Sequence, residues 1–161
     1  MQNVETQMTR NFALIGHTGD GKTSLGEALL HAAGATSALG KVDDGSSVLD
    51  HTPEEKERHH TLTSSLYGFT WNDFHLTLVD TPGDPNYLAD AQIAIQALDG
   101  ALLVVSAVDG VKAGTEKMLR AAQARKIPVL AFVNGLDRER ADLARAVESL
   151  GRLDDVKPLV L

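Results

Sequence analysis

Residues Gly16 to Thr23 carry the clearest chemistry in the sequence, reading Gly-His-Thr-Gly-Asp-Gly-Lys-Thr directly after the apolar run Phe12–Ile15. Glycines at this spacing allow backbone amides to converge on an anion. Lys22 can reach the β- and γ-phosphates, and the Thr23 hydroxyl can bind Mg²⁺. The alternative, a glycine-rich turn with a surface lysine, is disfavoured because the motif lies between a strand-like run and a helical pattern. The sequence therefore predicts a nucleoside triphosphate site.

A second motif, Asp80-Thr81-Pro82-Gly83, ends another apolar run. An acidic residue at the end of a buried strand can hold Mg²⁺ through water beside Thr23, and Gly83 can offer its N–H to a γ-phosphate. The same residues also suit an ordinary turn. Because a phosphate-binding loop precedes them, we favour the nucleotide-binding interpretation.

A third motif, Asn134-Gly135-Leu136-Asp137, follows the run Val129–Val133. Asp137 can accept hydrogen bonds from N1 and N2 of guanine, a pair of donors that adenine lacks. Asn134 can brace the phosphate loop. Capping of a helix that starts at Arg138 is the alternative role for Asp137. Together with the upstream motifs, Asp137 narrows the predicted ligand to a guanine nucleotide.

Composition limits the class of protein. The chain has 161 residues, a net charge of −7 and no cysteine, so disulfides and cysteine-based metal sites are excluded. The acidic balance argues against a broad nucleic-acid-binding surface. The polar start lacks a secretory signal, and no apolar run reaches the length of a membrane span. We expect a cytoplasmic protein that does not contact membranes.

Apolar runs of strand length alternate with helical patterns, which predicts a parallel sheet covered by helices. The predicted strands are Asn11–Ile15, Thr63–Thr70, His75–Asp80, Ala101–Ser106, Val129–Asn134 and the start of one at Leu159–Leu161. The predicted helices are Lys22–Ala33, Leu88–Ala97, Gly114–Arg125 and Arg138–Leu150. A hairpin turn at Trp71–Phe74 makes one strand antiparallel. The helix from Arg138 is interpreted as having a solvent-facing charged side.

The ordered motifs resemble the nucleotide-binding domain of translational GTPases, in particular elongation factor G and elongation-factor-G-like proteins. The segments Leu98–Ala101, Ala107–Val111 and Ala131–Asn134 also match and are more specific than a phosphate loop. The resemblance implies an α/β fold of the P-loop NTPase type, with three α/β/α layers and a mostly parallel sheet containing one antiparallel strand. It also implies a short tail at residues 1–10 and a GTP-binding domain at residues 11–161.

The family's first switch segment corresponds to Asp50–Ser64, within a loop at about residues 36–62 that shows no periodicity. Glu57–Thr63 stands where the family has Glu-Arg-Gly-Ile-Thr-Ile-Thr, which makes Thr61 the candidate switch threonine. Such segments become ordered on the γ-phosphate and relax after hydrolysis. The histidines of this loop, His51, His59 and His60, lack the compact spacing of a zinc site and are interpreted as part of a solvated charged segment.

Three departures from the family pattern qualify the expected activity. Asp84 stands where the family has the histidine that positions the attacking water, and a carboxylate there repels the γ-phosphate. Gly135 replaces the lysine of the base-reading motif, so we expect weaker binding with specificity retained by Asp137. The chain also stops before the family's Ser-Ala guanine-contacting loop, so we expect an N-terminal fragment of a longer factor or a truncated record.

The expected function is binding of Mg-GTP and its hydrolysis to GDP, which drives a conformational switch on the ribosome. The expected nucleotide contacts are Gly16, His17, Thr18, Gly19, Asp20, Gly21, Lys22, Thr23, Ser24, Asp80, Thr81, Pro82, Gly83, Asp84, Asn134, Gly135, Leu136 and Asp137. The expected metal ligands are Thr23, Thr61 and Asp80, and the expected catalytic residues are Lys22, Thr61, Gly83 and Asp84. We expect a monomer. A GTP-dependent regulatory switch that scarcely hydrolyses GTP stays open as an alternative, and an ATP-dependent P-loop kinase is a more remote one.

Overall fold

A five-stranded sheet in the order β2-β3-β1-β4-β5 forms the centre of the computed structural model, which describes residues 6–153 and 156–160. The strands are β1 (Thr9–Gly16), β2 (Ser65–Trp71), β3 (Phe74–Asp80), β4 (Gly100–Ser106) and β5 (Val129–Asn134). Strand β2 pairs antiparallel with β3, and the other three pairs are parallel. The predicted mixed sheet is confirmed.

The hairpin between β2 and β3 turns at Asn72 and Asp73, whose φ angles are 46° and 68°. Two consecutive positive φ angles give a turn whose twist suits antiparallel strands, and Asn and Asp tolerate this conformation best among residues with side chains. Trp71 and Phe74 pair across it. The turn predicted at Trp71–Phe74 is therefore confirmed.

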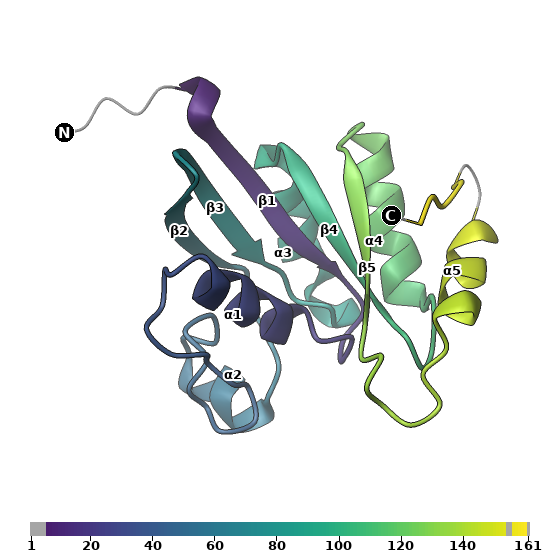
Figure 1. The fold of residues 1–161 in the computed structure, drawn as a ribbon, viewed down its shortest axis with the longest axis horizontal. Helices are drawn as coiled ribbons and strands as arrows, with labels where there is room; N and C mark the ends of the chain where they lie inside the picture. The colour runs from purple at the N-terminus through teal and green to yellow at the C-terminus, as the bar shows by residue number, and fades with distance from the viewer. Residues whose placement is uncertain (1–5, 154–155, 161) are drawn as a thin grey trace.

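Helices cover both faces of the sheet (Figure 1). They are α1 (Lys22–Ala32), α3 (Leu88–Ala94), α4 (Ala113–Ala124) and α5 (Leu143–Gly151). Successive residues of a strand point to opposite faces, so Leu14 packs with Leu30 of α1 whereas Ala13 and Ile15 pack with Met118 of α4. The result is the predicted α/β/α arrangement, with one hydrophobic core on each side of the sheet.

Helix α5 begins at Leu143 instead of the predicted Arg138. The Asp142 side chain accepts a hydrogen bond of 2.9 Å from the backbone N–H of Arg145 and so caps the helix. The residues before it form turns, with Arg140 at a φ of 68°. The predicted helix at Leu88–Ala97 also changes, since its last turn, Ile95–Ala97, is a 3₁₀ helix.

The segment at 36–62, predicted as a loop, contains the short helix α2 (Pro53–Arg58). Its start is a capping box, in which Thr52 accepts from the backbone of Glu55 and Glu55 accepts from the backbone of Thr52. Proline in the first turn adds a fixed φ that suits a helix start. A Thr-Pro-Glu-Glu signal was thus present in the sequence, although no apolar periodicity accompanied it.

At the ends of the chain, β1 begins at Thr9 instead of Asn11, and residues 1–5 of the predicted tail lie outside the described residues. Leu159 and Val160 are not in a strand, contrary to prediction, and Leu161 lies outside the described residues. Within residues 6–153 and 156–160, no helix has the length and apolar character needed to cross a membrane.

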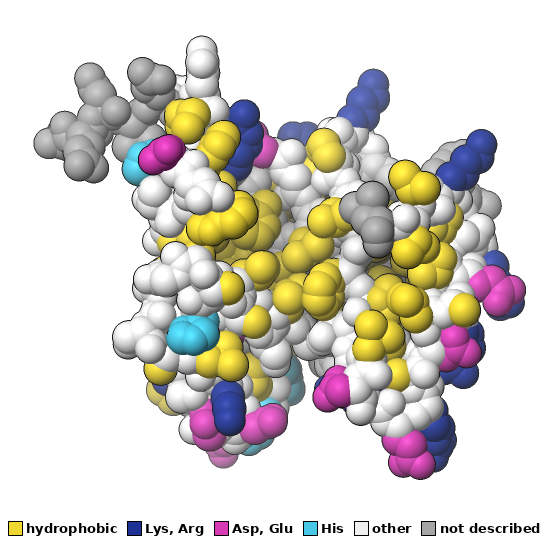
Figure 2. Space-filling model, viewed as in Figure 1, with side chains coloured by type: hydrophobic (Ala, Val, Ile, Leu, Met, Phe, Trp, Pro, Cys, Tyr) yellow, Lys and Arg dark blue, Asp and Glu magenta, His cyan; other side chains and the backbone are white. Residues whose placement is uncertain are grey.

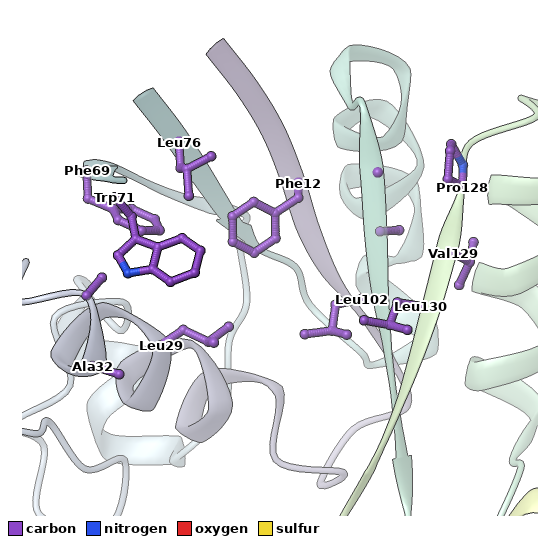
Figure 3. Close-up of a pocket in the computed structure, with 13 residues that line it drawn as sticks. Phe12, Leu29, Ala32, Phe69, Trp71, Leu76, Leu102, Pro128, Val129 and Leu130 are labelled. Atoms are coloured by element: carbon purple, nitrogen blue, oxygen red, sulfur yellow. The ribbon is translucent and has the colours of Figure 1, made fainter. Parts of the chain in front are cut away.

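A hydrophobic groove of about 610 Å³ remains on the α1 side of the sheet. Figures 2 and 3 show the apolar side chains gathered there, with Phe12, Leu102 and Leu130 from the sheet facing Leu29 of α1. Trp71 and Leu130 are 54% and 56% exposed. No charged side chain lines this groove and the Trp71 indole is the one polar side-chain group among its described lining residues, so the groove lacks the cations that a phosphate requires. It shares no residue with the nucleotide-site candidates.

Candidate nucleotide-binding site

The loop Gly16–Gly21 connects the carboxyl end of β1 to the amino end of α1. Gly21 is the N-cap of α1, and no side chain there bonds to the amides of the first turn. Unpaired N–H groups and the positive end of the helix dipole favour an anion at this position. The local structure thus has the form expected of a phosphate-binding loop.

Lys22 is buried, with 6% of its surface exposed, and its Nζ donates to the backbone oxygen of His17 at 2.9 Å. Burial lowers the pKa of Lys22, and the carboxylates of Asp80 and Asp20 offset part of this effect. A Cβ at position 83 would lie 2.3 Å from this Nζ, so only glycine permits the approach of the two segments. The ammonium group and the Gly83 backbone therefore lie side by side.

Three oxygen-bearing side chains from separate segments meet next to Lys22. The Thr23 hydroxyl donates to Asp80 Oδ2 at 2.7 Å, the Thr61 hydroxyl donates to the same oxygen at 3.2 Å, and the two hydroxyl oxygens are 3.0 Å apart. Burial raises the pKa of Asp80 to about 6, although the Thr23 hydrogen bond and the charge of Lys22 act in the opposite direction.

The other carboxylate oxygen of Asp80, Oδ1, is buried and has no hydrogen-bond partner among the described residues. Mg²⁺ prefers hard oxygen ligands, and it is bound in nucleotide sites by one or two protein groups together with phosphates and water. A carboxylate with an unpaired oxygen beside two hydroxyls fits this requirement. Thr23, Thr61 and Asp80 are thus suited to hold Mg²⁺.

Two buried glutamates fix the segment that carries Thr61. Glu55 of α2 is fully buried, and its Oε1 accepts from the backbone N–H groups of Leu62 and Thr63 at 3.0 and 3.2 Å. Burial alone would raise the pKa of Glu55, but the backbone amides of Leu62, Thr52 and Thr63 outweigh it and hold the pKa below its ordinary value. Thr61 is therefore followed directly by residues that a buried carboxylate anchors.

Glu27 of α1, also fully buried, anchors the earlier part of the same segment. Its Oε1 accepts from the Ser47 hydroxyl at 2.8 Å and from the backbone N–H groups of Val48 and Leu49 at 2.7 and 3.0 Å. Sequence reasoning did not identify Glu27 or Glu55. Glu27 lies in a predicted helix and Glu55 in the segment predicted as a loop, and most of their partners are backbone amides that carry no sequence signal.

The acidic residue inside the phosphate loop is neutralised by the residue that precedes α4. Asp20 Oδ1 lies 2.8 Å from Lys112 Nζ, and the Asp20 side chain is fully buried. Burial alone would lower the pKa of Lys112, but its bonds with Asp20 and Asp109 raise the pKa above its ordinary value. The Asp20 charge is therefore paired with Lys112 and does not oppose an anion in the loop.

The end of β5 is tied to the phosphate loop, because Asn134 Nδ2 donates to the backbone oxygen of Asp20 at 2.9 Å. This is the bracing predicted for Asn134. Asp137 is exposed in the turn that follows, and α5 is capped by Asp142, so the capping role considered for Asp137 is wrong. The Asp137 carboxylate stays available to a ligand.

Two residues expected to contact nucleotide use their side chains to bond backbone groups of the protein. Asp84 Oδ1 accepts from the backbone N–H of Asn86 at 2.8 Å and so caps the 3₁₀ turn Pro85–Tyr87. The Thr81 hydroxyl donates to the backbone oxygen of Leu14 at 2.6 Å. Neither side chain lines the cavity over the phosphate loop.

This cavity has a volume of about 160 Å³. Among the expected residues it is lined by Thr18, Gly19, Gly21, Lys22, Thr23, Ser24, Thr61 and Gly83. The expected residues that do not line it are Gly16, His17, Asp20, Asp80, Thr81, Pro82, Asp84, Asn134, Gly135, Leu136 and Asp137. His17 instead packs against α4, where a Cβ on Gly114 would lie 2.5 Å from its Nδ1.

Five further residues line the same cavity without having been predicted, namely Val42, Asp43, His59, His60 and Arg138. His59 and His60 were interpreted as a solvated charged segment, and Arg138 as helix surface. All three lie in turns, and the His59 ring also bonds to the distant backbone oxygen of Val42. Among the described residues, no three or more His, Asp or Glu side chains are grouped so that they could hold a metal ion.

Curated proteins with similar sequences are mitochondrial ribosome-releasing factors 2. The one from Danio rerio is 35% identical over 159 residues, covering 99% of this chain and 21% of the relative. The one from Schizosaccharomyces pombe is 36% identical over 160 residues, covering 99% of this chain and 20% of the relative. The chain thus spans about a fifth of the length of these relatives. Their names place them in mitochondria, whereas the sequence led us to expect a cytoplasmic protein.

Solved structures share the fold. A crystal structure of a protein from Thermus thermophilus superposes with a TM-score of 0.84 at 36% identity, covering 89% of this chain and 22% of the other. A bacterial selenocysteine-specific elongation factor gives a TM-score of 0.70 at 28% identity, covering 88% of this chain and 22% of the other. The family description of the elongation factor Tu GTP-binding domain matches residues 7–155. With its phosphate loop, braced Asn134 and mixed five-stranded sheet, the chain belongs to the elongation factor Tu GTP-binding domain family of translational GTPases.

Proposed function

We propose that the chain binds Mg-GTP and hydrolyses it to GDP and phosphate, as the nucleotide-binding domain of an elongation-factor-G-like translation factor. The observation that carries the proposal is the convergence of Thr23, Thr61 and Asp80 beside Lys22, with an unpaired carboxylate oxygen among them. Hydroxyls, a carboxylate and a buried ammonium at the start of an uncapped helix are the groups that a metal-bound triphosphate requires.

In the proposed complex, the amides of the phosphate loop bind the phosphate oxygens and Lys22 compensates their charge. Thr23, Thr61 and Asp80 would hold Mg²⁺, which supplies further charge compensation when bound. The Gly83 N–H would donate to the γ-phosphate. Thr61 belongs to the segment at residues 47–63 that Glu27 and Glu55 anchor. When the γ-phosphate leaves, this segment would lose the contact that Thr61 makes with the Mg-triphosphate.

Guanine would be read by Asp137, which accepts from N1–H and the N2 amino group, while Asn134 holds the loop in place. We further propose that the factor acts as a monomer on the ribosome, in the cytoplasm or, as the names of the relatives indicate for them, in mitochondria. GTP, Mg²⁺ and the ribosome are the proposed ligand, metal and partner.

Paired titrations with GTP and ATP in the presence of Mg²⁺ test the binding proposal. We expect GTP to bind about 100-fold more tightly than ATP, because adenine leaves the Asp137 carboxylate without its two donors. Equal affinities would contradict the proposed base recognition. Multiple-turnover hydrolysis, measured with and without ribosomes, then tests the enzymatic part.

A GTP-dependent switch that scarcely hydrolyses its ligand is a second candidate function, and Asp84 is the observation that favours it. Its carboxylate bonds to the backbone of Asn86 and does not line the phosphate cavity, so no imidazole is available at this position to orient a water molecule. Multiple-turnover hydrolysis that stays at background with ribosomes present would select this alternative.

Changing Asp84 to His is expected to raise single-turnover GTP hydrolysis at least about tenfold, because an imidazole that orients water contributes on the order of 10²-fold or more. Asp84→Asn is the matched control, since asparagine keeps the cap on Asn86 without adding an imidazole. If both variants accelerate equally, the negative charge of Asp84 was the obstacle. If neither differs from the original chain, Asp84 does not limit the chemistry.

A further inference from the structure

Arg138 is a cationic residue at the nucleotide cavity that the motifs do not assign. It lines the cavity over the phosphate loop together with Thr18 and Gly19, and its side chain is exposed. It lies in the turn between β5 and α5, where its backbone N–H donates to the Gly135 oxygen at 3.1 Å. This turn places Arg138, the residue after Asp137, at the same cavity as the phosphate loop.

The glycine at position 135 makes room for this arrangement. Gly135 has a φ of +78°, a conformation that residues with side chains rarely adopt. A Cβ there would lie 3.2 Å from Cδ and 3.4 Å from Nε of Arg138, so the arginine side chain passes directly over the glycine. The Arg138 side chain therefore takes the space that a side chain at position 135 would use.

The two cationic side chains that line the cavity differ in their hydrogen-bond partners. Lys22 and Arg138 are the lysine and the arginine among the lining residues, and Asp43 adds a carboxylate to the wall. Lys22 is buried and already donates to the His17 oxygen, whereas the Arg138 guanidinium has no hydrogen bond or ion pair in the described part of the chain. A guanidinium without partners offers several N–H donors that match phosphate oxygens.

We propose that Arg138 is a binding residue for the polyphosphate of the nucleotide, closing the phosphate cavity from its solvent side as the second cation after Lys22. The inference rests on the proposed function, since it names a further residue of the same site. It assigns Arg138 to phosphate affinity and leaves the choice of base to Asp137.

Titrations of GTP and ATP into the original chain and into Arg138→Ala test this assignment. We expect Arg138→Ala to weaken both nucleotides by about tenfold, the effect of one charge-assisted contact, and to leave the ratio of their affinities unchanged. Arg138→Lys, which retains the charge without the planar fork, should lose about threefold. Arg140→Ala removes an exposed arginine of the same turn that does not line the cavity, and it should change nothing.

The outcomes separate the two levels of the proposal. If the original chain binds neither nucleotide, the proposed function is wrong. If the original chain binds GTP and Arg138→Ala binds it equally well, only the role of Arg138 is wrong. A loss confined to GTP, which would change the ratio, overturns the phosphate contact in favour of a contact with guanine. A lower unfolding temperature for Arg138→Ala but not for Arg140→Ala, together with no partial rescue by Arg138→Lys, overturns the assignment in favour of a structural role.

Discussion

Replacing Lys22 with methionine is expected to lower the affinity for Mg-GTP by at least about 100-fold, equivalent to roughly 3 kcal/mol for the loss of charge-assisted bonds to phosphate. Methionine has a similar length and is compatible with burial, so the change removes charge more than volume. Lys22 is 6% exposed, and among the described residues that line the cavity it is the one lysine. Isothermal titration with GTP measures the effect.

The same substitution changes the electrostatics of the folded protein. The pKa of Asp80 is raised to about 6 by burial even with the Lys22 charge lowering it, so removal of the ammonium will favour the protonated carboxyl. A protonated Asp80 does not suit Mg²⁺, which adds to the loss of affinity. Lys117→Met, on the exposed side of α4, is the matched control and should bind GTP normally. Retention of GTP binding within about threefold in a folded Lys22→Met chain would contradict the assigned role of the lysine.

The sequence predicted the sheet well because its strands are short apolar runs with clear boundaries. Val129–Asn134 agrees with β5 at both ends, and the two cores follow from alternation along β1. The predicted start of α5 was wrong because residues 138–142 are mostly polar and form turns. The helix begins only after Asp142, whose side chain caps it. Helix α2 was missed because six residues are too few for a periodic pattern, and its stability comes from the buried Glu55 instead.

At the site, the motifs predicted that Asp80 lies beside Thr23, and the family resemblance added Thr61. The three side chains do meet, although they come from separate segments. The hydrogen-bond and ion-pair partners of each side chain could not be predicted from the sequence. Spacing does not reveal that Lys112 pairs with Asp20, that Asp84 bonds to its own turn, or that Arg138 crosses Gly135. These features depend on the folded positions of segments that no local pattern connects.

Changing Asp137 to asparagine is expected to convert the preference of the site from guanine to xanthine. Guanine presents two donors, N1–H and the N2 amino group, which the two oxygens of a carboxylate can both accept. An asparagine amide offers one acceptor and one donor group, so its NH₂ would face the N2 amino group of guanine. We expect GTP affinity to fall by about 100- to 1,000-fold, the loss of one to two bonds to a charged group.

Xanthine carries a carbonyl oxygen in place of the N2 amino group, so the asparagine amide can donate to it while accepting from N1–H. XTP should therefore bind Asp137→Asn more tightly than GTP does, reversing the order in the original chain. Asp142→Asn is the matched control, because asparagine also caps helices well and the Asp142 carboxylate already accepts from the backbone N–H of Arg145. Competition titrations with GTP and XTP on both variants decide the matter. Since Arg138 and Lys22 are unchanged in each variant, a uniform loss of both nucleotides would place Asp137 in the phosphate contacts and not at the base.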